Sequence, residues 1–316
     1  MSTTSANKSQ SSSDYVEIAC QSCGATLLLQ PHLVSTVCPY CASPSVIQRP
    51  PSKDLPRPTF VIGFAVDHER ATALVKRWIG GRSMFARSDF KRAAPELTRG
   101  VYLPAYLYGA VSDSTFSAEI GENYTVTETY TTTDANGKTV VRTRTVTKTE
   151  WRTLRGNHQS YVMDVVVTAS RGVSNAALEA IEPFDLRGPR RFSPSILAGW
   201  LAEEPSRTQD ECFRLAHDET VAKVGGKLEN FMPGDSHRNL RYQVQLSREV
   251  IDLVLFPVWS YAVRYDPDKP PVRILVNGQT GRVAGDTPIS QWKIAAAVGV
   301  GLMLVLAFVL ILALSQ

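Results

Sequence analysis

Cys20-Gln-Ser-Cys23-Gly-Ala-Thr-Leu-Leu-Leu-Gln-Pro-His-Leu-Val-Ser-Thr-Val-Cys38-Pro-Tyr-Cys41 is the most informative stretch of the chain, because it contains two CxxC pairs. A two-residue spacer lets both sulfurs of a pair point at one ion, and two pairs supply the four thiolates of a closed tetrahedral zinc site. The pairs are separated by residues 24–37, enough for a short hairpin and close to the usual four-cysteine zinc spacing. We therefore predict a zinc ribbon over residues 15–47. Its predicted ligands are Cys20, Cys23, Cys38 and Cys41.

The alternatives are two disulfides or four unrelated buried thiols. Residues 1–14 are polar and Ser/Thr-rich, and they lack the apolar segment of a secretory signal peptide. We expect these residues to form a disordered tail and the protein to meet a reducing cytosol, where paired cysteines bind metal more often than they oxidise. The fifth cysteine, Cys212, falls in a predicted helix and is expected to be a core residue. Four thiolates leave no position for water or substrate, so the predicted zinc is structural.

The composition of the ribbon indicates what it contacts. Residues 15–47 contain no Lys or Arg, whereas a nucleic-acid reader needs cations to displace counterions from phosphates. The net charge of the whole chain is only +4, so no global basic field indicates nucleic acid either. The ribbon is therefore expected to contact protein or to serve the fold alone.

The other end of the chain is apolar. Residues 294–314 contain no charged or strongly polar side chain, and a helix of this length spans roughly 30 Å, about one hydrocarbon core. Trp292 and Lys293 precede it, as an interfacial aromatic residue and a cytoplasmic-side cation would. We predict a single transmembrane helix that anchors the protein in the lipid bilayer, with the large N-terminal part in the cytoplasm. The alternative is a buried core helix.

Small residues in this helix also suggest self-association. Ala295 with Gly299, and Ala297 with Gly301, give two small-xxx-small spacings that permit close helix approach. A homo-oligomer through these residues is thus expected as one option. The alternative is that Ala and Gly are simply common in such helices.

Between the two ends we predict a Pro-rich linker (48–58), an α+β core (59–286) and a juxtamembrane segment (287–293). The core is expected to be dominated by antiparallel sheet. A helix over 68–79 is expected to be capped by Asp67. The other predicted elements are strands at 60–65, 100–120, 162–169, 240–247 and 250–265, helices at 195–204 and 207–228, and a hairpin over 272–283.

The core also contains a long predicted hairpin. Residues 124–133 and 139–151 are Thr-rich with period-two alternation, and Asn136-Gly137 between them favours a type I′ turn. The arms have few large aliphatic residues, so we expect much of this hairpin to be exposed. Basic residues gather on or after its second arm, where they could meet phosphates, anionic headgroups or an acidic partner. They are Arg142, Arg144, Lys148, Arg152 and Arg155. The simpler interpretation is a solvated strand whose charges prevent edge-to-edge aggregation.

Two short motifs resemble those of enzymes, but neither matches the pattern that the chemistry requires. A helicase needs a phosphate-binding loop, but the Gly-Lys-Thr run at 137–139 has Thr132 where the leading glycine is required. Asp235-Ser236-His237 places triad residue types side by side, whereas catalytic triads are assembled in space. We expect a polar loop there and predict that the protein is not an enzyme.

Several motifs together carry a family resemblance. They are the two CxxC pairs, Tyr102-Leu-Pro-Ala-Tyr-Leu-Tyr108, Leu197-Ala-Gly-Trp-Leu-Ala-Glu203, Phe256-Pro-Val-Trp259, Val276-Asn-Gly-Gln-Thr-Gly-Arg-Val283, Pro288 and Lys293. On these residues the chain resembles bacterial TFIIB-type zinc-ribbon proteins with a C-terminal membrane anchor, over most of residues 15–293. The family is sometimes labelled primosomal or helicase-like. The resemblance implies metal binding by the four cysteines and an adaptor role in membrane stress or remodelling.

Two functions are therefore expected as alternatives. The first is a non-enzymatic, membrane-anchored zinc-ribbon adaptor that binds other proteins at the cytoplasmic face of the membrane. The second is a membrane-tethered nucleic-acid-binding protein that uses the ribbon and the basic residues from Arg142 to Arg155.

Overall fold

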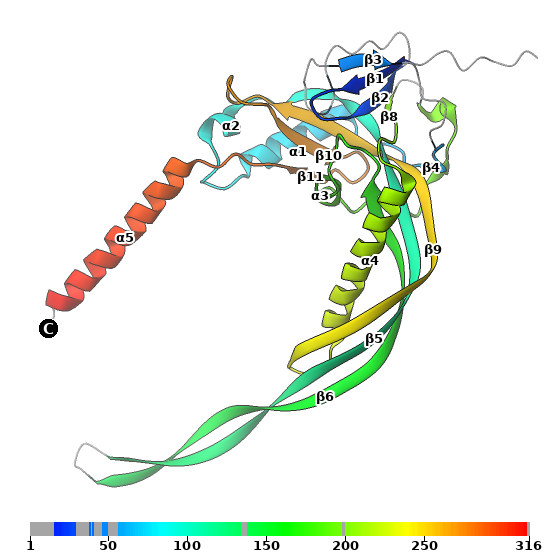
Figure 1. The fold of residues 1–316 in the computed structure, drawn as a ribbon. Helices are drawn as coiled ribbons and strands as arrows, with labels where there is room; N and C mark the ends of the chain where they lie inside the picture. Colours follow the sequence, from blue (N-terminus) through cyan, green and yellow to red (C-terminus); the bar gives the residue numbers. More distant parts are fainter. Residues whose placement is uncertain are drawn as a thin grey trace, which may run out of the picture. The chain divides into compact units, whose positions relative to one another are not determined.

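The computed structural model describes residues 16–29, 38, 40, 46–49, 56–133, 138–197 and 200–314 (Figure 1). Contacts divide the chain into two compact units. Unit 1 comprises Met1–Tyr106, Val166–Cys212 and Asp252–Gln316, and unit 2 comprises Leu107–Val165 and Phe213–Ile251. Strands and helices occur in both units, which confirms the predicted α+β class.

The strands of the described residues are β1 (Val16–Cys20), β2 (Thr26–Leu29), β3 (Val46–Arg49), β4 (Phe60–Val61), β5 (Glu96–Thr133), β6 (Thr139–Thr168), β7 (Arg190–Arg191), β8 (Leu201–Glu203), β9 (Ser236–Val263), β10 (Val272–Asn277) and β11 (Val283–Gly285). The sheet order is β11-β10-β9-β5-β8-β2-β1-β3, with β6 on β5 and with β4 beside β7 and β9. Most registered pairs are antiparallel, as expected, but β4–β9 and β5–β8 are parallel.

The helices are α1 (His68–Gly80), α2 (Ser88–Arg92), α3 (Asn175–Glu179), α4 (Gln209–Phe231) and α5 (Gln291–Leu314), with a 3₁₀ turn at Pro194–Leu197. The predicted cap of α1 is confirmed, because the Asp67 carboxylate accepts the Arg70 backbone N–H at 2.8 Å. Residues four apart on α1, Ala71, Val75 and Ile79, are buried against β9 and β10. The helix thereby covers the sheet of unit 1.

An aromatic cluster closes the centre of unit 1. Phe64 stacks on Trp200, with ring centroids 4.1 Å apart, and meets Tyr102 and Trp259 edge-on. The Trp259 indole donates to the Val66 carbonyl at 2.8 Å, so its polar atom is satisfied in the core. This cluster explains why β5, β8 and β9 lie next to one another.

In unit 2, α4 packs on the sheet formed by β5, β6 and β9 (Figure 1). Phe213 meets Tyr108 and Phe231 meets Phe116, both edge-on. At Gly225 an added Cβ would lie 2.1 Å from the Tyr242 hydroxyl. A larger residue at that position would require the exposed Tyr242 side chain to move.

The predicted hairpin is confirmed as β5 and β6, and its distal arms are largely exposed. Tyr124, Tyr130 and Val141 all lie in contact with solvent. The predicted turn at Asn136-Gly137 lies outside the described residues.

Some predicted elements were wrong. Instead of a helix at 195–204, the chain forms the 3₁₀ turn and then β8, because Leu201–Glu203 is drawn into the sheet beside β2 and β5. The strand expected at 60–65 is only Phe60–Val61. The two strands expected at 240–247 and 250–265 are one strand, β9, which begins at Ser236 where a polar loop was expected.

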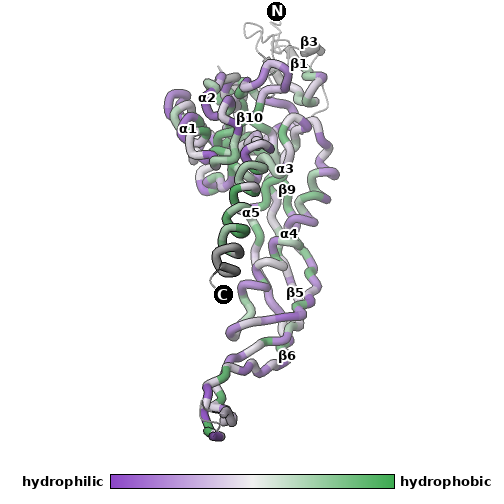
Figure 2. Tube along the Cα trace, turned by 90° about the vertical axis from the view of Figure 1, so that its left-hand side faces the viewer, coloured by the Kyte–Doolittle hydropathy of each residue, from purple (hydrophilic) through white to green (hydrophobic). Residues whose placement is uncertain are grey.

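Helix α5 is long and apolar enough to cross a membrane (Figure 2). In the window from Gln291 to Phe308, no residue is buried inside the protein. From Gln291 to Phe308 the helix is therefore exposed, whereas a core helix would be covered by other elements.

Candidate metal centre

The ribbon is an antiparallel arrangement of β1 with β2 on one side and β3 on the other. Cys20 ends β1, and a tight turn follows it. The Cys20 N–H donates to the Ala25 carbonyl at 2.8 Å, and the Gly24 N–H donates to the Cys20 carbonyl at 2.9 Å. Gly24 has a φ of +76°, as expected for a knuckle that needs left-handed backbone. The turn therefore brings the Cys20 and Cys23 side chains to the same side.

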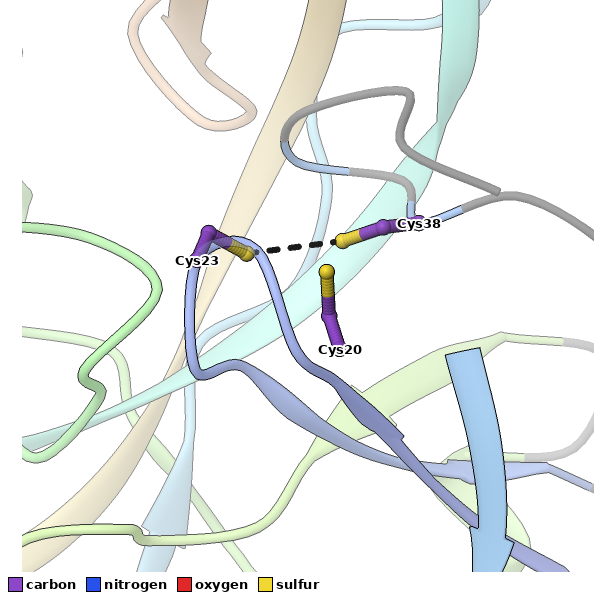
Figure 3. A group of neighbouring side chains, drawn as sticks. All are labelled: Cys20, Cys23 and Cys38. Atoms are coloured by element: carbon purple, nitrogen blue, oxygen red, sulfur yellow. Dashed lines mark hydrogen bonds between the residues drawn. The ribbon is translucent and has the colours of Figure 1, made fainter. Parts of the chain in front are cut away.

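Three of the four predicted ligands come together (Figure 3). The Sγ atoms of Cys20, Cys23 and Cys38 lie within 4.8 Å of one another, and those of Cys23 and Cys38 are 3.6 Å apart. Two thiolates on one tetrahedral zinc, each about 2.3 Å from the ion, would lie roughly 3.8 Å apart. The three sulfurs thus fit a single metal ion. Cys41 lies outside the described residues, so its part as fourth ligand stays a prediction.

A disulfide does not fit the described sulfurs. The separation of 3.6 Å between Cys23 and Cys38 is far longer than the roughly 2.05 Å of an S–S bond. No disulfide joins the cysteines in the described part of the chain. Cys212 lies apart from the cluster, buried on α4, with its thiol directed at the Thr168 carbonyl. Burial raises the pKa of Cys212 to about 11, which fits the predicted inert core residue.

The cluster is shielded from water. Cys20 and Cys38 are buried and Cys23 is partly buried. The Tyr40 backbone N–H donates to the Cys38 sulfur at 3.4 Å. Such a donor favours the charged thiolate, the form that binds metal.

The ribbon docks on the rest of unit 1 through backbone hydrogen bonds. β2 pairs antiparallel with β8, with Leu27 opposite Glu203 and Leu28 opposite Ala202. The Glu204 N–H extends this pairing with a 2.9 Å bond to the Thr26 carbonyl. The metal centre is consequently built into the edge of a larger sheet.

A buried carboxyl, Glu203, lies beside the cluster and was not among the predicted site residues. Glu203 is 2% exposed and accepts a 2.5 Å hydrogen bond from the Ser170 hydroxyl. Burial raises the pKa of Glu203 to about 8, and the nearby Cys23 sulfur acts in the same direction. Burial and then the charge of Glu203 raise the pKa of the buried Tyr40 hydroxyl. The signal that could have been noticed is an acidic residue in the apolar run Leu201–Glu203.

The loop at residues 170–173 packs against the knuckle that contains Ala25. The Ser170 hydroxyl accepts the N–H groups of Gly172 and Val173 at 2.8 and 3.1 Å. Gly172 meets Ala25 so closely that an added Cβ would lie 2.5 Å from the Ala25 Cβ. The absence of a side chain at Gly172 therefore sets how closely the ribbon approaches.

We expect Gly172→Val to destabilise the ribbon by about 1–3 kcal/mol, the usual cost of overpacking a tight contact. The valine would displace the knuckle and weaken the β2–β8 pairing. The measurement is protection of the ribbon cysteines from a thiol-alkylating reagent in the metal-loaded protein. Gly188→Val is the matched control, since an added Cβ at Gly188 meets no atom within 4 Å in the described structure. Equal alkylation rates in the two variants would contradict the proposed docking contact.

Three of the five predicted basic residues of the hairpin have carboxylate partners. Arg144 and Lys148 of β6 pair with Glu128 of β5 at 3.1 and 2.8 Å. Arg152 forms an ion pair with Glu122. The cations, Lys148 first, lower the pKa of Glu128, so the pairing persists at neutral pH. Three cations of the predicted basic stripe are thus paired across the hairpin, two of them with the same carboxylate.

Asp235-Ser236-His237 has a structural role at its first residue. The Asp235 carboxylate accepts the Asn123 backbone N–H at 2.7 Å. This bond ties the start of β9 to β5 within unit 2.

Comparison with known proteins gives one informative match. The chain is 25% identical over 241 residues to a protein described as "Uncharacterized protein YdjG" from Bacillus subtilis (strain 168). The match covers 76% of this chain and 66% of that protein, so it spans slightly less than two thirds of the relative's length. No protein-family model matches the chain, and no solved structure matches it.

Proposed function

We propose that this protein is a membrane-anchored, non-enzymatic adaptor whose zinc ribbon binds other proteins at the cytoplasmic face of the membrane. The observation that carries the proposal is that the thiolate cluster and α5 belong to the same compact unit. A partner held by the ribbon would thereby be held at a membrane. The resemblance to TFIIB-type zinc-ribbon proteins adds a role in membrane stress or remodelling to the proposal.

Zinc is the metal we propose, with Cys20, Cys23, Cys38 and Cys41 as its ligands. Thiolates are soft donors that select zinc or iron–sulfur centres, and a closed four-cysteine ribbon is typical of structural zinc. A filled shell binds no substrate, so its contribution is to hold the knuckles and strands in place.

The backbone of the ribbon offers a way to bind a partner. β3 is the last strand in the sheet order, so within the described residues one edge of it pairs with no strand. An extended peptide can add to such an edge through main-chain hydrogen bonds. The lack of Lys and Arg over 15–47 favours a protein partner over nucleic acid at this surface.

The proposed topology puts unit 2 and the part of unit 1 that precedes α5 in the cytoplasm, because Lys293 stands before the apolar part of α5. The small residues on α5 add a proposed self-association surface. Gly299 and Gly301 have open space where a Cβ would be, so a second α5 could approach closely there. Gly299→Leu combined with Gly301→Leu should then abolish a crosslinked dimer in membranes.

The alternative function is nucleic-acid binding through the ribbon and residues Arg142 to Arg155. The ion pairs of Arg144, Lys148 and Arg152 with β5 carboxylates weigh against it, because paired cations release fewer counterions from phosphates. It therefore enters the test below as an outcome.

The test is affinity capture of the full-length protein from gently solubilised native membranes, with in-cell crosslinking and quantification of bound protein and nucleic acid. We expect protein partners that are lost in Cys38→Ser and retained in Cys212→Ser, the matched variant in which the altered cysteine lies outside the ribbon. Partners that bind both variants equally would contradict a ribbon contact. Recovery of nucleic acid that is lost in Arg142→Glu/Arg144→Glu/Lys148→Glu would support the alternative instead.

A further inference from the structure

The start of α5 is fastened to the loop between α1 and α2. The Ser290 N–H donates to the Phe85 carbonyl at 2.8 Å, and the Arg87 N–H donates to the Pro288 carbonyl at 2.9 Å. An antiparallel bridge joins Ala86 to Ile289, and the Lys293 ammonium donates to the Ala86 carbonyl at 2.8 Å. The first turn of α5 therefore has a fixed position relative to α2.

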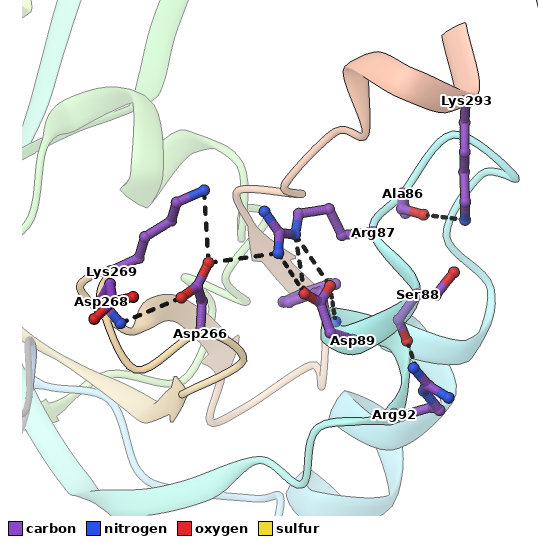
Figure 4. A network of polar contacts seen from close by, with 10 residues as sticks. Ala86, Arg87, Ser88, Asp89, Arg92, Asp266, Asp268, Lys269 and Lys293 are labelled. Atoms are coloured by element: carbon purple, nitrogen blue, oxygen red, sulfur yellow. Dashed lines mark hydrogen bonds and ion pairs between the residues drawn. The ribbon is translucent and has the colours of Figure 1, made fainter. Parts of the chain in front are cut away.

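A polar pocket of about 610 Å³ lies at this junction (Figure 4). Its lining includes four cations, Arg87, Arg92, Lys269 and Lys293, and one carboxylate, Asp89. These residues come from α2 and its N-cap residue Arg87, from the 265–271 turn and from the start of α5. A cavity of this size takes a small anionic group together with bound water.

Two of the four cations, Arg87 and Lys269, are already paired with carboxylates. Arg87 pairs with Asp89 and with Asp266, and Lys269 lies 3.7 Å from the same Asp266 carboxylate. The bond from Arg87 lowers the pKa of Asp89 to about 2, so this pairing holds at every physiological pH.

The other two, Arg92 and Lys293, donate to the backbone carbonyls of Ser88 and Ala86. Among the described residues, no ion pair includes Arg92 or Lys293. A backbone carbonyl satisfies one hydrogen bond but leaves the positive charge uncompensated. The pocket thus retains positive charge after its internal pairs are counted.

The pocket lies where the chain would enter a bilayer. Trp292, which also lines it, is 80% exposed, and the apolar run starts directly after Lys293. Tryptophan at the end of a transmembrane helix sits at the depth of the lipid headgroups. The two uncompensated cations would meet a dense layer of phosphates at that depth.

We propose that this pocket binds the phosphate of an anionic phospholipid headgroup, with Arg92 and Lys293 as its main contacts. The proposal rests on membrane insertion of α5, as in the proposed function. Binding there would fix the orientation of unit 1 relative to the membrane, since the pocket residues are hydrogen-bonded to the start of α5. A free phosphate ion has the same charge but no acyl chains that could contact the exposed Trp292. We therefore assign the lipid as the ligand.

The experiment uses the full-length protein in neutral detergent. Its thermal unfolding midpoint is followed during titration with short-chain phosphatidylglycerol, short-chain phosphatidylcholine or inorganic phosphate. We expect saturable binding of phosphatidylglycerol, at least about tenfold tighter than of the other two probes. The pair Arg92→Gln/Lys293→Gln should weaken it about tenfold or more, because each cation near an anionic surface contributes about fivefold.

The matched control is Lys76→Gln/Arg77→Gln, which removes two exposed cations of α1 that lie outside the pocket. Its affinity for phosphatidylglycerol should equal that of the wild type. An equal loss of phosphatidylglycerol affinity in the two double variants would overturn the proposed pocket. Binding of phosphatidylcholine as tight as that of phosphatidylglycerol would overturn it as well. Binding of inorganic phosphate as tight as that of phosphatidylglycerol would overturn the lipid assignment. Retention of wild-type protein in carbonate-washed membranes, measured in parallel, separates these failures from a failure of α5 to insert.

Discussion

The Cys38→Ser variant is expected to purify without zinc, whereas the wild-type protein should carry about one zinc ion per chain. The loss should be complete, because binding of structural zinc by a four-cysteine site is worth roughly 10–16 kcal/mol and depends on every ligand. Metal content of the purified protein, measured by atomic absorption, checks this. Removal of the metal from wild-type protein with a strong chelator should have the same effect.

Loss of the metal should unfold the ribbon. Cys20 and Cys38 are buried, and without an ion their thiols give no attraction between the two knuckles. β1, β2 and β3 are short, so their pairing alone does not hold them. The β2–β8 bonds should be lost with them, which exposes the edge of β8 and the carboxyl of Glu203.

The remainder of the chain should stay folded. The aromatic cluster around Trp259 and the packing of α4 in unit 2 involve no ribbon residue. Limited proteolysis of Cys38→Ser should therefore cleave between residues 16 and 58 and leave a stable C-terminal fragment. Cys212→Ser, which removes a buried thiol outside the cluster, should keep its zinc and its ribbon. Global unfolding of Cys38→Ser would contradict the independence of the core from the ribbon.

Local chemistry explains which parts of the fold were predictable. Asp67 caps α1, and Gly24 adopts the left-handed knuckle, because each depends on a few adjacent residues. The long hairpin was also predictable, since period-two alternation over many residues fits a strand alone. In the metal centre, the spacing of the cysteines predicted three ligands that the structure brings together.

What could not be predicted depends on partners far away in sequence. Leu201–Glu203 has a helical composition, and it becomes a strand because β2 and β5 pair with it on either side. Glu203 enters the centre only through that pairing. The same holds for Arg144 and Lys148, because their pairing with Glu128 depends on the register between β5 and β6. A sequence pattern shows which face of a strand is basic but not which residue lies opposite.

A variant that ends at Lys293 is expected to move from the membrane fraction to the soluble fraction. Removal of residues 294–316 deletes the continuous apolar run 294–314, and on insertion scales each Leu, Ile, Phe or Val at the helix centre contributes about −0.3 to −0.6 kcal/mol. The side chains of Ile294, Val298 and Leu304 contact no core, so their loss leaves no cavity in unit 1. Fractionation of cell lysates with carbonate washing measures the change.

The position of the truncation decides whether release from the membrane can be distinguished from misfolding. Ending at Asp286 would also remove the bonds from residues 288–290 to Phe85 and Arg87 and the bond from Lys293 to Ala86. A soluble product would then be ambiguous between release and misfolding. Ending at Lys293 keeps every one of these contacts, so the thermal unfolding of the soluble variant should match that of the full-length protein in detergent. If the variant ending at Lys293 stayed in washed membranes, α5 would not be the anchor, and another surface of the protein would bind the membrane.

A full-length variant with Leu304→Arg is expected to show weaker but not abolished membrane retention. One cation at the centre of a transmembrane helix raises the free energy of insertion by about 2.5–3.5 kcal/mol.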